Sequence, residues 1–269
     1  MMIHAPVLKT KLGTEYLQHS GVAVVGRPTT SLSNMSGFLS NITDGDDYLR
    51  DDHPHPISNQ GGFLSKIAGQ MCYQSFGTHR TKTHEGQRYI ANILTQGHGS
   101  VLEHANYTVL LYGISRSCTH ELVRHRAGCA FSQTSQRYVD APRFVERPEF
   151  QHDPDAHRLF LDRIDRVTSE YRTLQSYLIK DKPSNKEGRI AANQAARALL
   201  PNEVESPIVM TANLRAWRHI LNLRGSQYAE PEIRGLAVNI FTVLQNYEPW
   251  VFQDMSVENG RIVSHFPKV

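Results

Sequence analysis

The chain has 269 residues, of which 39% are hydrophobic and 20% are charged, and its formal net charge is +3. This composition is typical of a folded domain with a substantial core, and so small a positive charge gives little support to a general nucleic-acid-binding protein. Three cysteines without a CxxC pair argue against a disulfide framework and against a structural zinc site. Because no apolar run reaches the ~18 residues of a membrane span and the first 25 residues lack the apolar stretch of a signal peptide, we expect a cytoplasmic protein.

The first part of the chain, residues 1–61, is rich in Ser, Asn, Asp, Gly and Pro and shows no sustained periodicity. We expect it to be an N-terminal extension made mostly of loop, with one short strand over residues 22–25. Residues 62–269 carry the regular patterns, and we assign them to a single domain.

Three helices and a strand are predicted next. Apolar residues recur at helical spacing from Gly62 onward, and a second helix is expected over residues 83–95. The run NYTVLLYGI, residues 106–114, is typical of a buried strand. The segment SRSCTHELVRHRAG then predicts a helix with a serine N-cap and a glycine near its end, which places residues 124–126 on its last turn.

The second half of the chain is mostly helical in pattern. An apolar stripe from Leu159 to Leu178 predicts a long helix, and a break over 182–188 separates it from a helix in RIAANQAARALLP. VESPIVMTA reads as a short strand, NLRAWRHILNLRG as a helix ending at Gly225, and PEIRGLAVNIFTVLQNY as a last helix with Pro231 in its first turn. Helices with few strands and no regular βαβ alternation indicate a single α+β domain.

Arginines that point in opposite directions are the first indication of function. At about 100° per residue, Arg124 and Arg126 point about 200° apart on a helix, and Arg215 and Arg224 also face away from each other. Because guanidinium groups suit phosphate, we infer a site that holds two anionic ligands. Two alternatives remain open: cations that only stabilise a helix C-terminus, and a helix that only presents a solvated polar face.

Four blocks of the sequence resemble one family of enzymes. The RHR motif followed after eight residues by SQRY, within residues 124–138, resembles the signature of the flavin-dependent thymidylate synthases. Three further blocks resemble that family in the same order, namely QGHGSVLEH (96–104), ARALLP (196–201) and NLRAWRHILNLR (213–224). The family usually has seven residues before the serine, so one extra residue must be absorbed near Gly128.

The resemblance implies a fold, a reaction and its cofactors. The implied fold is an antiparallel sheet flanked by helices. The implied enzyme transfers a methylene group from 5,10-methylenetetrahydrofolate to C5 of dUMP and reduces it to give dTMP, with FAD as cofactor and NADPH as reductant. A homotetramer with sites at subunit interfaces is implied as well. We therefore expect that the protein binds small molecules and that it binds no nucleic acid, membrane or metal ion.

The resemblance also carries residue roles over, position by position. The residues implied to contact FAD are His98, Ser100, Glu103, Arg124, His125, Arg126, Asn213, Arg215 and His219. The residues implied to hold the nucleotide are Glu121, Arg124, Gln133, Ser135, Gln136, Arg137, Arg197 and Arg224. The catalytic candidates are Arg224, whose cation offsets the negative charge that develops on the pyrimidine, and Ser135. No general base stands at a fixed spacing from Ser135, so we expect it to position the substrate.

Three other hypotheses remain open. Cys129, beside the RHR motif, is a second candidate nucleophile. Ser132 and Gln133 stand where many family members carry Asn-Glu, which leaves open a relative that methylates UMP in nucleoside-antibiotic biosynthesis. A third possibility, from another class, is a non-enzymatic module that binds nucleotides or single-stranded nucleic acid, although only Phe131 and Tyr138 interleave aromatic rings with the arginines.

Overall fold

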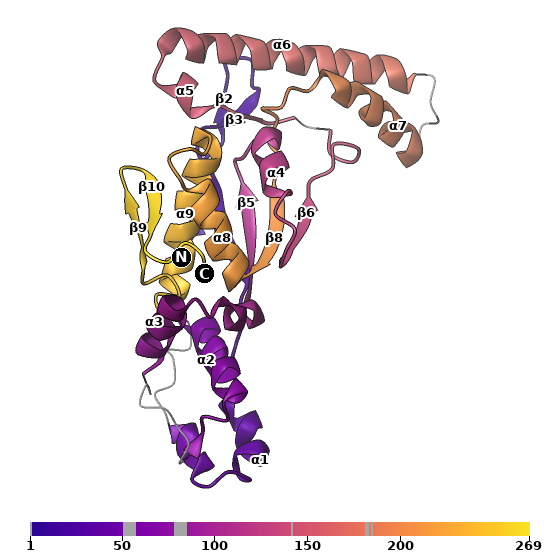
Figure 1. The fold of residues 1–269 in the computed structure, drawn as a ribbon. Coiled ribbons are helices and arrows are strands. Elements are labelled where there is room, and N and C mark those ends of the chain that lie inside the picture. Colours follow the sequence, from indigo (N-terminus) through magenta and orange to yellow (C-terminus); the bar gives the residue numbers. More distant parts are fainter. Residues whose placement is uncertain (1, 51–57, 78–84, 141, 181–182, 184) are drawn as a thin grey trace.

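The computed structural model describes residues 2–50, 58–77, 85–140, 142–180, 183 and 185–269. Its centre is a five-stranded sheet. In sheet order its strands are β1 (Met2–Ile3), β4 (Gly21–Gly26), β5 (Asn106–Tyr112), β8 (Ile208–Asn213) and β6 (Cys129–Gln133). Each neighbouring pair is antiparallel, and helices flank the sheet (Figure 1). The predicted α+β architecture with an antiparallel sheet is confirmed.

Two helices cover one face of this sheet and form the main core. α8 (Leu214–Arg224) buries the stripe predicted from its periodicity, which is Leu214, Trp217 and Leu221. α9 (Pro231–Tyr247) packs beside α8 and against β4, and it has proline in its first turn as expected (Figure 1). Stacking two amphipathic helices on one sheet face removes their apolar sides from water, which is the main stabilising contribution of such a layer.

The buried carboxylate of Glu248 fixes the start of the helix α2 (Gln60–Cys72). Glu248 accepts hydrogen bonds from the backbone N–H groups of Gly61 at 2.6 Å and Gly62 at 2.8 Å, and from the hydroxyl of Tyr107 on β5. Burial raises the pKa of Glu248, whereas these hydrogen bonds favour its ionised form. The first turn of α2 is thereby tied to the central sheet.

Short helices continue from α2 toward the site. α3 (Gly86–Gln96) is followed by Gly97, whose φ of +72° closes the helix, and then by η4 (Gly99–His104). The predicted start of this helix at residue 83 lies outside the described residues. α2 packs against both α3 and η4, so the segment 96–104 rests on a fixed base.

The opposite end of the molecule is built from α6 (Pro154–Ile179) and α7 (Lys186–Ala196), which pack against each other (Figure 1). Phe160, Ile164 and Tyr171 are buried on α6, as the stripe predicts, but Leu159 is 65% exposed, so the buried stripe begins one residue later. Part of the predicted break between the two helices lies outside the described residues.

The remaining elements are short. They are β2 (Leu8–Lys9), β3 (Glu15–Leu17), η1 (Leu32–Met35), α1 (Ser36–Leu39), η2 (Gly45–Arg50), β7 (Phe144–Val145), α5 (Pro148–Gln151), η5 (Arg197–Leu199), β9 (Met255–Glu258) and β10 (Arg261–Ser264). β2, β3 and β7 form a second, three-stranded sheet, and β9 pairs with β10 as an antiparallel hairpin.

The stretch 1–61 is more regular than its composition suggests. The strand predicted over 22–25 is confirmed as part of β4, which pairs with β5 in the centre of the sheet. β1, β2, β3, η1, α1 and η2 also lie in this stretch, so it contains more regular structure than expected, and its separation from residues 62–269 stays a prediction. Composition misleads here because pairing with β5 supplies the hydrogen bonds and burial that the local sequence lacks.

An ion pair in the interior joins α8 to the last part of the chain. Arg218 has no exposed surface, and its Nη1 and Nη2 atoms lie 2.7 and 2.9 Å from the two carboxylate oxygens of Asp254. The same guanidinium donates to the backbone oxygens of Val251, Phe266 and Val269. Hydrogen bonds from Arg218 lower the pKa of Asp254 against the opposing effect of burial.

We expect Asp254→Ala to lower the free energy of unfolding by about 3–5 kcal/mol, because it leaves the Arg218 guanidinium buried without its carboxylate. Urea denaturation measures the change. The matched control is Asp155→Ala, which removes a carboxylate paired with Arg158 on the exposed surface of α6 and should cost less than about 1 kcal/mol. Equal losses for the two variants would contradict a stabilising buried pair.

Candidate functional site

The residues predicted for the site come from six places in the fold. His98, Ser100 and Glu103 lie at η4; Glu121 lies on α4 (Arg116–Leu122); Arg124, His125 and Arg126 lie between α4 and β6; Gln133, Ser135, Gln136 and Arg137 lie at the end of β6 and just after it; Arg197 begins η5; and Asn213, Arg215, His219 and Arg224 belong to α8 and its N-cap.

The RHR motif lies after α4 and not on its last turn. The Oγ atom of Ser115 caps α4 by accepting the N–H of Cys118 at 3.0 Å, but the helix ends at Leu122. Arg124 and Arg126 are therefore exposed loop residues, and the argument from helical geometry does not apply to them. The chain must turn from α4 into β6 within six residues, and this reversal ends the helix early.

Gly128 makes that turn possible. Its φ is +70°, and a Cβ atom at this position would lie 2.5 Å from Nδ2 of Asn213. β6 starts at the next residue and pairs with β8, with Cys129 opposite Ala212. The sequence analysis did not predict β6, because this edge strand has only five residues and its inner side offers just two apolar side chains, Cys129 and Phe131, both half-buried.

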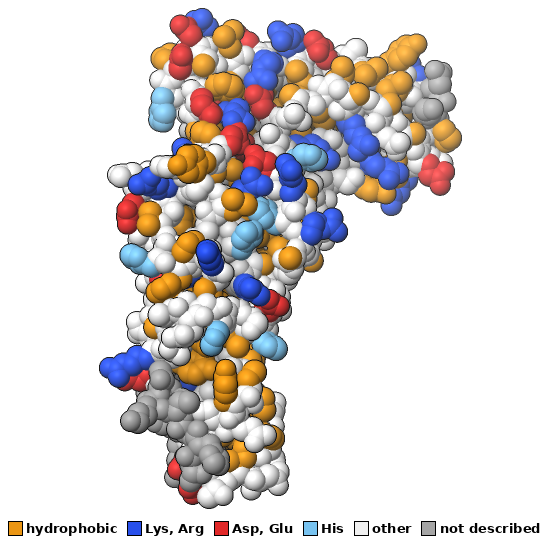
Figure 2. All heavy atoms as spheres, in the orientation of Figure 1, with side chains coloured by type: hydrophobic (Ala, Val, Ile, Leu, Met, Phe, Trp, Pro, Cys, Tyr) orange, Lys and Arg blue, Asp and Glu red, His pale blue; other side chains and the backbone are white. Residues whose placement is uncertain are grey.

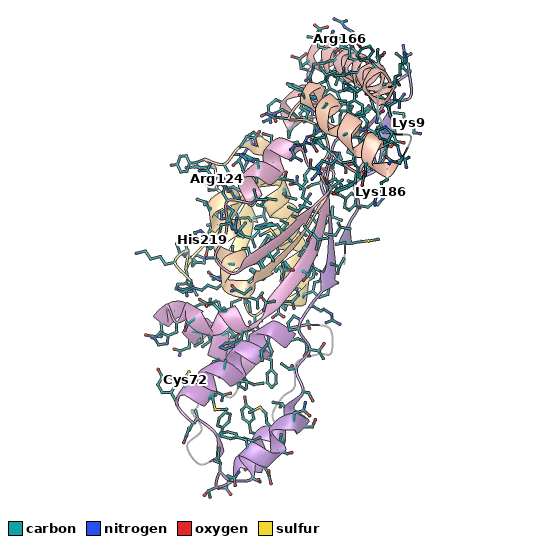
Figure 3. The ribbon with its side chains drawn as sticks, turned by 90° about the vertical axis from the view of Figure 1, so that its right-hand side faces the viewer. Lys9, Cys72, Arg124, Arg166, Lys186 and His219 are labelled. Atoms are coloured by element: carbon teal, nitrogen blue, oxygen red, sulfur yellow. The ribbon has the colours of Figure 1, made fainter. Side chains whose placement is uncertain are left out.

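A compact hydrogen-bonded group forms around Arg224. Its Nη1 atom lies 2.5 Å from Oε2 of Glu121, its Nη2 donates to the backbone oxygen of the same residue at 3.2 Å, and its Nε donates to Nε2 of His125 at 2.9 Å. The ring of His219 lies 6.0 Å from that of His125, edge to face. Figure 3 shows Arg124 and His219 on the same side of the molecule. One α4 carboxylate thus holds the last arginine of α8 in a fixed orientation.

His125 is neutral in this group, because its Nε2 atom must be unprotonated to accept the hydrogen bond from Arg224. Burial first, and then the positive charges of Arg224, His219 and Arg124, lower the pKa of His125 to about 4. The ring therefore accepts a hydrogen bond on one side and keeps an N–H donor on the other.

Arg215, at the other end of α8, lines a cleft of about 370 Å³ together with Glu103, Gly128, Asn213 and His219. Its Nη1 atom lies 2.6 Å from Oε1 of Glu103. The Oδ1 atom of Asn213 accepts the N–H of Ala216, which leaves the Nδ2 group of its amide directed elsewhere. The cleft therefore presents a guanidinium, an amide and an imidazole on one wall.

Arg215 also lines a second hollow of about 350 Å³, between α2, α3 and η4. His98 and Ser100 line it on one side, and Tyr73 and Tyr89 line it on the other. Burial raises the pKa of Tyr89 to about 12, so this phenol is a hydrogen-bond donor at neutral pH. The two adjacent hollows account for most of the residues that sequence comparison assigns to the cofactor.

The residues predicted for the nucleotide are only partly gathered within one chain. Gln133 donates to Oγ1 of Thr119 on α4 at 2.7 Å. Gln136 lines a separate hollow of about 300 Å³, and Arg137 lines another of about 280 Å³ at α7. Arg197 is half-buried on η5. Figure 2 shows Lys and Arg side chains gathered on the concave side of the molecule, where α4 and β6 lie beneath α7.

The cysteine hypothesis does not fit this environment. Burial raises the pKa of the Cys129 thiol, and its Sγ atom donates weakly to the backbone oxygen of Ala127 at 3.4 Å. A protonated thiol is a poor nucleophile. Within the described part of the chain, no group of three or more His, Cys, Asp or Glu side chains is placed to hold a metal ion, and no helix is long and apolar enough to cross a bilayer.

The cleft also contains residues that the sequence did not indicate. Pro267, Lys268 and Val269 line it together with Asn213 and Arg215. They follow the β9–β10 hairpin and lie beyond every block that resembles the family. Their position depends on the tertiary fold, so no local pattern could have indicated them.

Comparisons with known proteins agree with the geometry. A family model described as "Thymidylate synthase complementing protein" matches residues 59–250. A flavin-dependent thymidylate synthase from Corynebacterium diphtheriae is 41% identical over 214 residues, which is 77% of this chain and 84% of that relative. Relatives of the same name from Mycobacterium avium and Mycobacterium tuberculosis are each 42% identical over 212 residues, with the same shares of both chains.

We expect His125 to make the stability of the fold dependent on pH. Its pKa is lower in the folded chain than the ordinary value near 6.5, so its stabilising contribution is full above pH 6.5 and is lost as the pH falls toward 4. Urea denaturation at pH 7.5 and pH 5.0 should show a loss about 1–2 kcal/mol larger for the wild type than for His125→Gln, allowing for the partial exposure of the ring.

The control for this effect is His152→Gln, which changes an exposed histidine and should keep the pH dependence of the wild type. If His125→Gln also keeps that dependence, His125 is not held in the neutral form.

Proposed function

Since the chain belongs to the family of the flavin-dependent thymidylate synthases, we propose that it methylates dUMP at C5 to give dTMP. The enzyme is a methyltransferase, with 5,10-methylenetetrahydrofolate as the one-carbon donor, FAD as the cofactor and NADPH as the reductant. When bound, the flavin supplies the reducing equivalents that convert the transferred methylene group into a methyl group. The observation that carries the proposal is that α8 directs its two arginines to different places. Arg215 lines the cleft, whereas Arg224 pairs with Glu121.

The cleft at Arg215 has a donor set that suits a dinucleotide. A guanidinium and an amide donate to phosphate and to ring oxygens, and Glu103 holds the guanidinium in place. The backbone can approach closely here, because a Cβ atom on Gly99 would lie only 3.2 Å from Nε of Arg215. We assign FAD binding to His98, Ser100, Glu103, Arg124, His125, Arg126, Asn213, Arg215 and His219.

Arg224 is our candidate for stabilising the reacting pyrimidine. Making C5 nucleophilic builds negative charge on the ring oxygens, and a cation that is already oriented lowers the cost of that charge. Glu121 orients Arg224. The neighbouring ring of His125 is neutral, so it adds no second positive charge beside Arg224. We assign nucleotide binding to Glu121, Arg124, Gln133, Ser135, Gln136, Arg137, Arg197 and Arg224. Ser135 is proposed to position the nucleotide.

We propose that further copies of the chain complete the site. Arg124, Arg126 and Arg137 are exposed in one chain, and Gln136 and Arg137 line hollows other than the cleft of Arg215. A homotetramer with sites at its interfaces would bring such residues to one ligand. In this proposal the catalytic unit consists of residues 62–269 together with β1 and β4. We propose that it acts on small molecules in the cytoplasm.

An assay with three readouts tests the function. The purified chain should show flavin absorbance, oxidise NADPH, and release tritium from C5-labelled dUMP when methylenetetrahydrofolate is present. Parallel reactions with UMP test the rival substrate, because Ser132 and Gln133 stand where the family resemblance differs. Faster methylation of UMP would refute the choice of dUMP, and a chain that binds no flavin would refute the enzyme.

A matched pair of variants on α8 should separate the two roles. We expect Arg224→Ala to lower kcat/KM for dUMP by about 100-fold or more with flavin retained, because it removes an oriented cation from the reacting ring. Arg215→Ala should instead weaken flavin binding, measured by the flavin absorbance of the purified protein. Arg166→Ala, on the exposed face of α6, should change neither quantity. Loss of flavin from Arg224→Ala with unchanged turnover per bound flavin would move Arg224 to the cofactor.

A further inference from the structure

The last segment of the described chain, residues 265–269, forms one wall of the cleft that Arg215 lines. Pro267, Lys268 and Val269 line it together with Asn213 and Arg215. This segment lies beyond residues 59–250, the part that the family model matches. The family match therefore assigns no role to this segment.

The segment is anchored from the interior. The buried guanidinium of Arg218 donates to the backbone oxygens of Phe266 at 3.2 Å and Val269 at 3.1 Å. The carboxylate of Asp254, which pairs with Arg218, accepts the N–H of Phe266 at 3.2 Å and the hydroxyl of Ser264 at 2.9 Å. Val269 is itself buried, so Lys268 is fixed between two anchored neighbours while its own side chain stays exposed.

Lys268 adds a positive charge to the lining of the cleft. The charged side chains that line it are Glu103, Arg215 and Lys268. Glu103 and Arg215 form an ion pair at 2.6 Å and offset each other's charge. Among the residues that the structure describes, no carboxylate pairs with Lys268. Lys268 is therefore the cation of this lining whose charge no described carboxylate side chain offsets.

We propose that Lys268 binds the pyrophosphate of the flavin cofactor and that Arg218 is a positioning residue, which docks residues 265–269 so that this lysine lines the same cleft as Arg215. The proposal rests on the proposed function, because it takes FAD as the ligand of this cleft. A lysine ammonium is a mobile point charge that suits phosphate oxygens, and a wall fixed at two backbone oxygens lowers the entropic cost of presenting it.

The test is a titration of flavin-free protein with FAD and, separately, with riboflavin, which has no phosphate. At low salt we expect Lys268→Ala to raise the Kd for FAD about fivefold and Lys268→Glu to raise it further, with Lys268→Arg close to the wild type. Riboflavin binding should not change. Added salt should shrink the difference between wild type and Lys268→Ala, because it screens the contact.

The control is Lys11→Ala, which removes an exposed lysine far along the chain and should leave both affinities unchanged. Asp254→Asn tests the positioning role: if this variant folds, adding Lys268→Ala to it should produce little further loss of FAD affinity. If Asp254→Asn does not fold, the Lys268 variants alone test whether Lys268 binds the FAD pyrophosphate.

Three results would overturn the inference. The first is an unchanged FAD affinity in Lys268→Ala and Lys268→Glu. The second is an equal loss of riboflavin binding, which would indicate a general change of the cleft. The third is a raised KM for NADPH or for the folate with unchanged FAD affinity, which would assign the lysine to another anion. A wild-type chain that binds no FAD would instead refute the proposed function.

Discussion

The buried face of α8 is the constraint on which the candidate site depends. Trp217 has no exposed surface, and next to it Arg218 is held by both carboxylate oxygens of Asp254. A helix anchored by a large aromatic ring and a buried ion pair cannot roll without leaving a cavity or an unpaired charge. Because this face is fixed, the directions of Arg215 and Arg224 are fixed as well, one toward η4 and the other toward α4.

Each of these two arginines is matched by a carboxylate from an element that is anchored separately. Glu103 comes from η4, which rests on α2, and α2 is tied to the sheet by Glu248. Glu121 comes from α4, which packs Cys118 and other apolar side chains into the main core. Guanidinium groups that are already oriented need little reorganisation when a ligand binds or when charge develops on it.

The parts of the fold that could be predicted from sequence are those with a strong local signal. α8 and α9 have apolar residues at helical spacing and clear end signals, so their bounds follow from periodicity. β6 could not be predicted, because five residues with two half-buried apolar side chains give too short a period to detect. The placement of Arg124 and Arg126 on a helix was wrong because α4 ends at Leu122 and the chain then turns into β6, with a positive φ at Gly128. The burial of Arg218 against Asp254 and the position of Lys268 in the cleft depend on contacts between residues distant in sequence. A local sequence pattern cannot predict such contacts.

The division of the two arginines between two ligands is tested most directly by a crystal structure of the chain with FAD and dUMP bound. We predict that the Arg215 guanidinium lies within hydrogen-bond distance of FAD and that the Arg224 guanidinium lies within hydrogen-bond distance of dUMP in the same site. A structure in which both arginines contact one ligand, or in which neither contacts a ligand, would contradict the account.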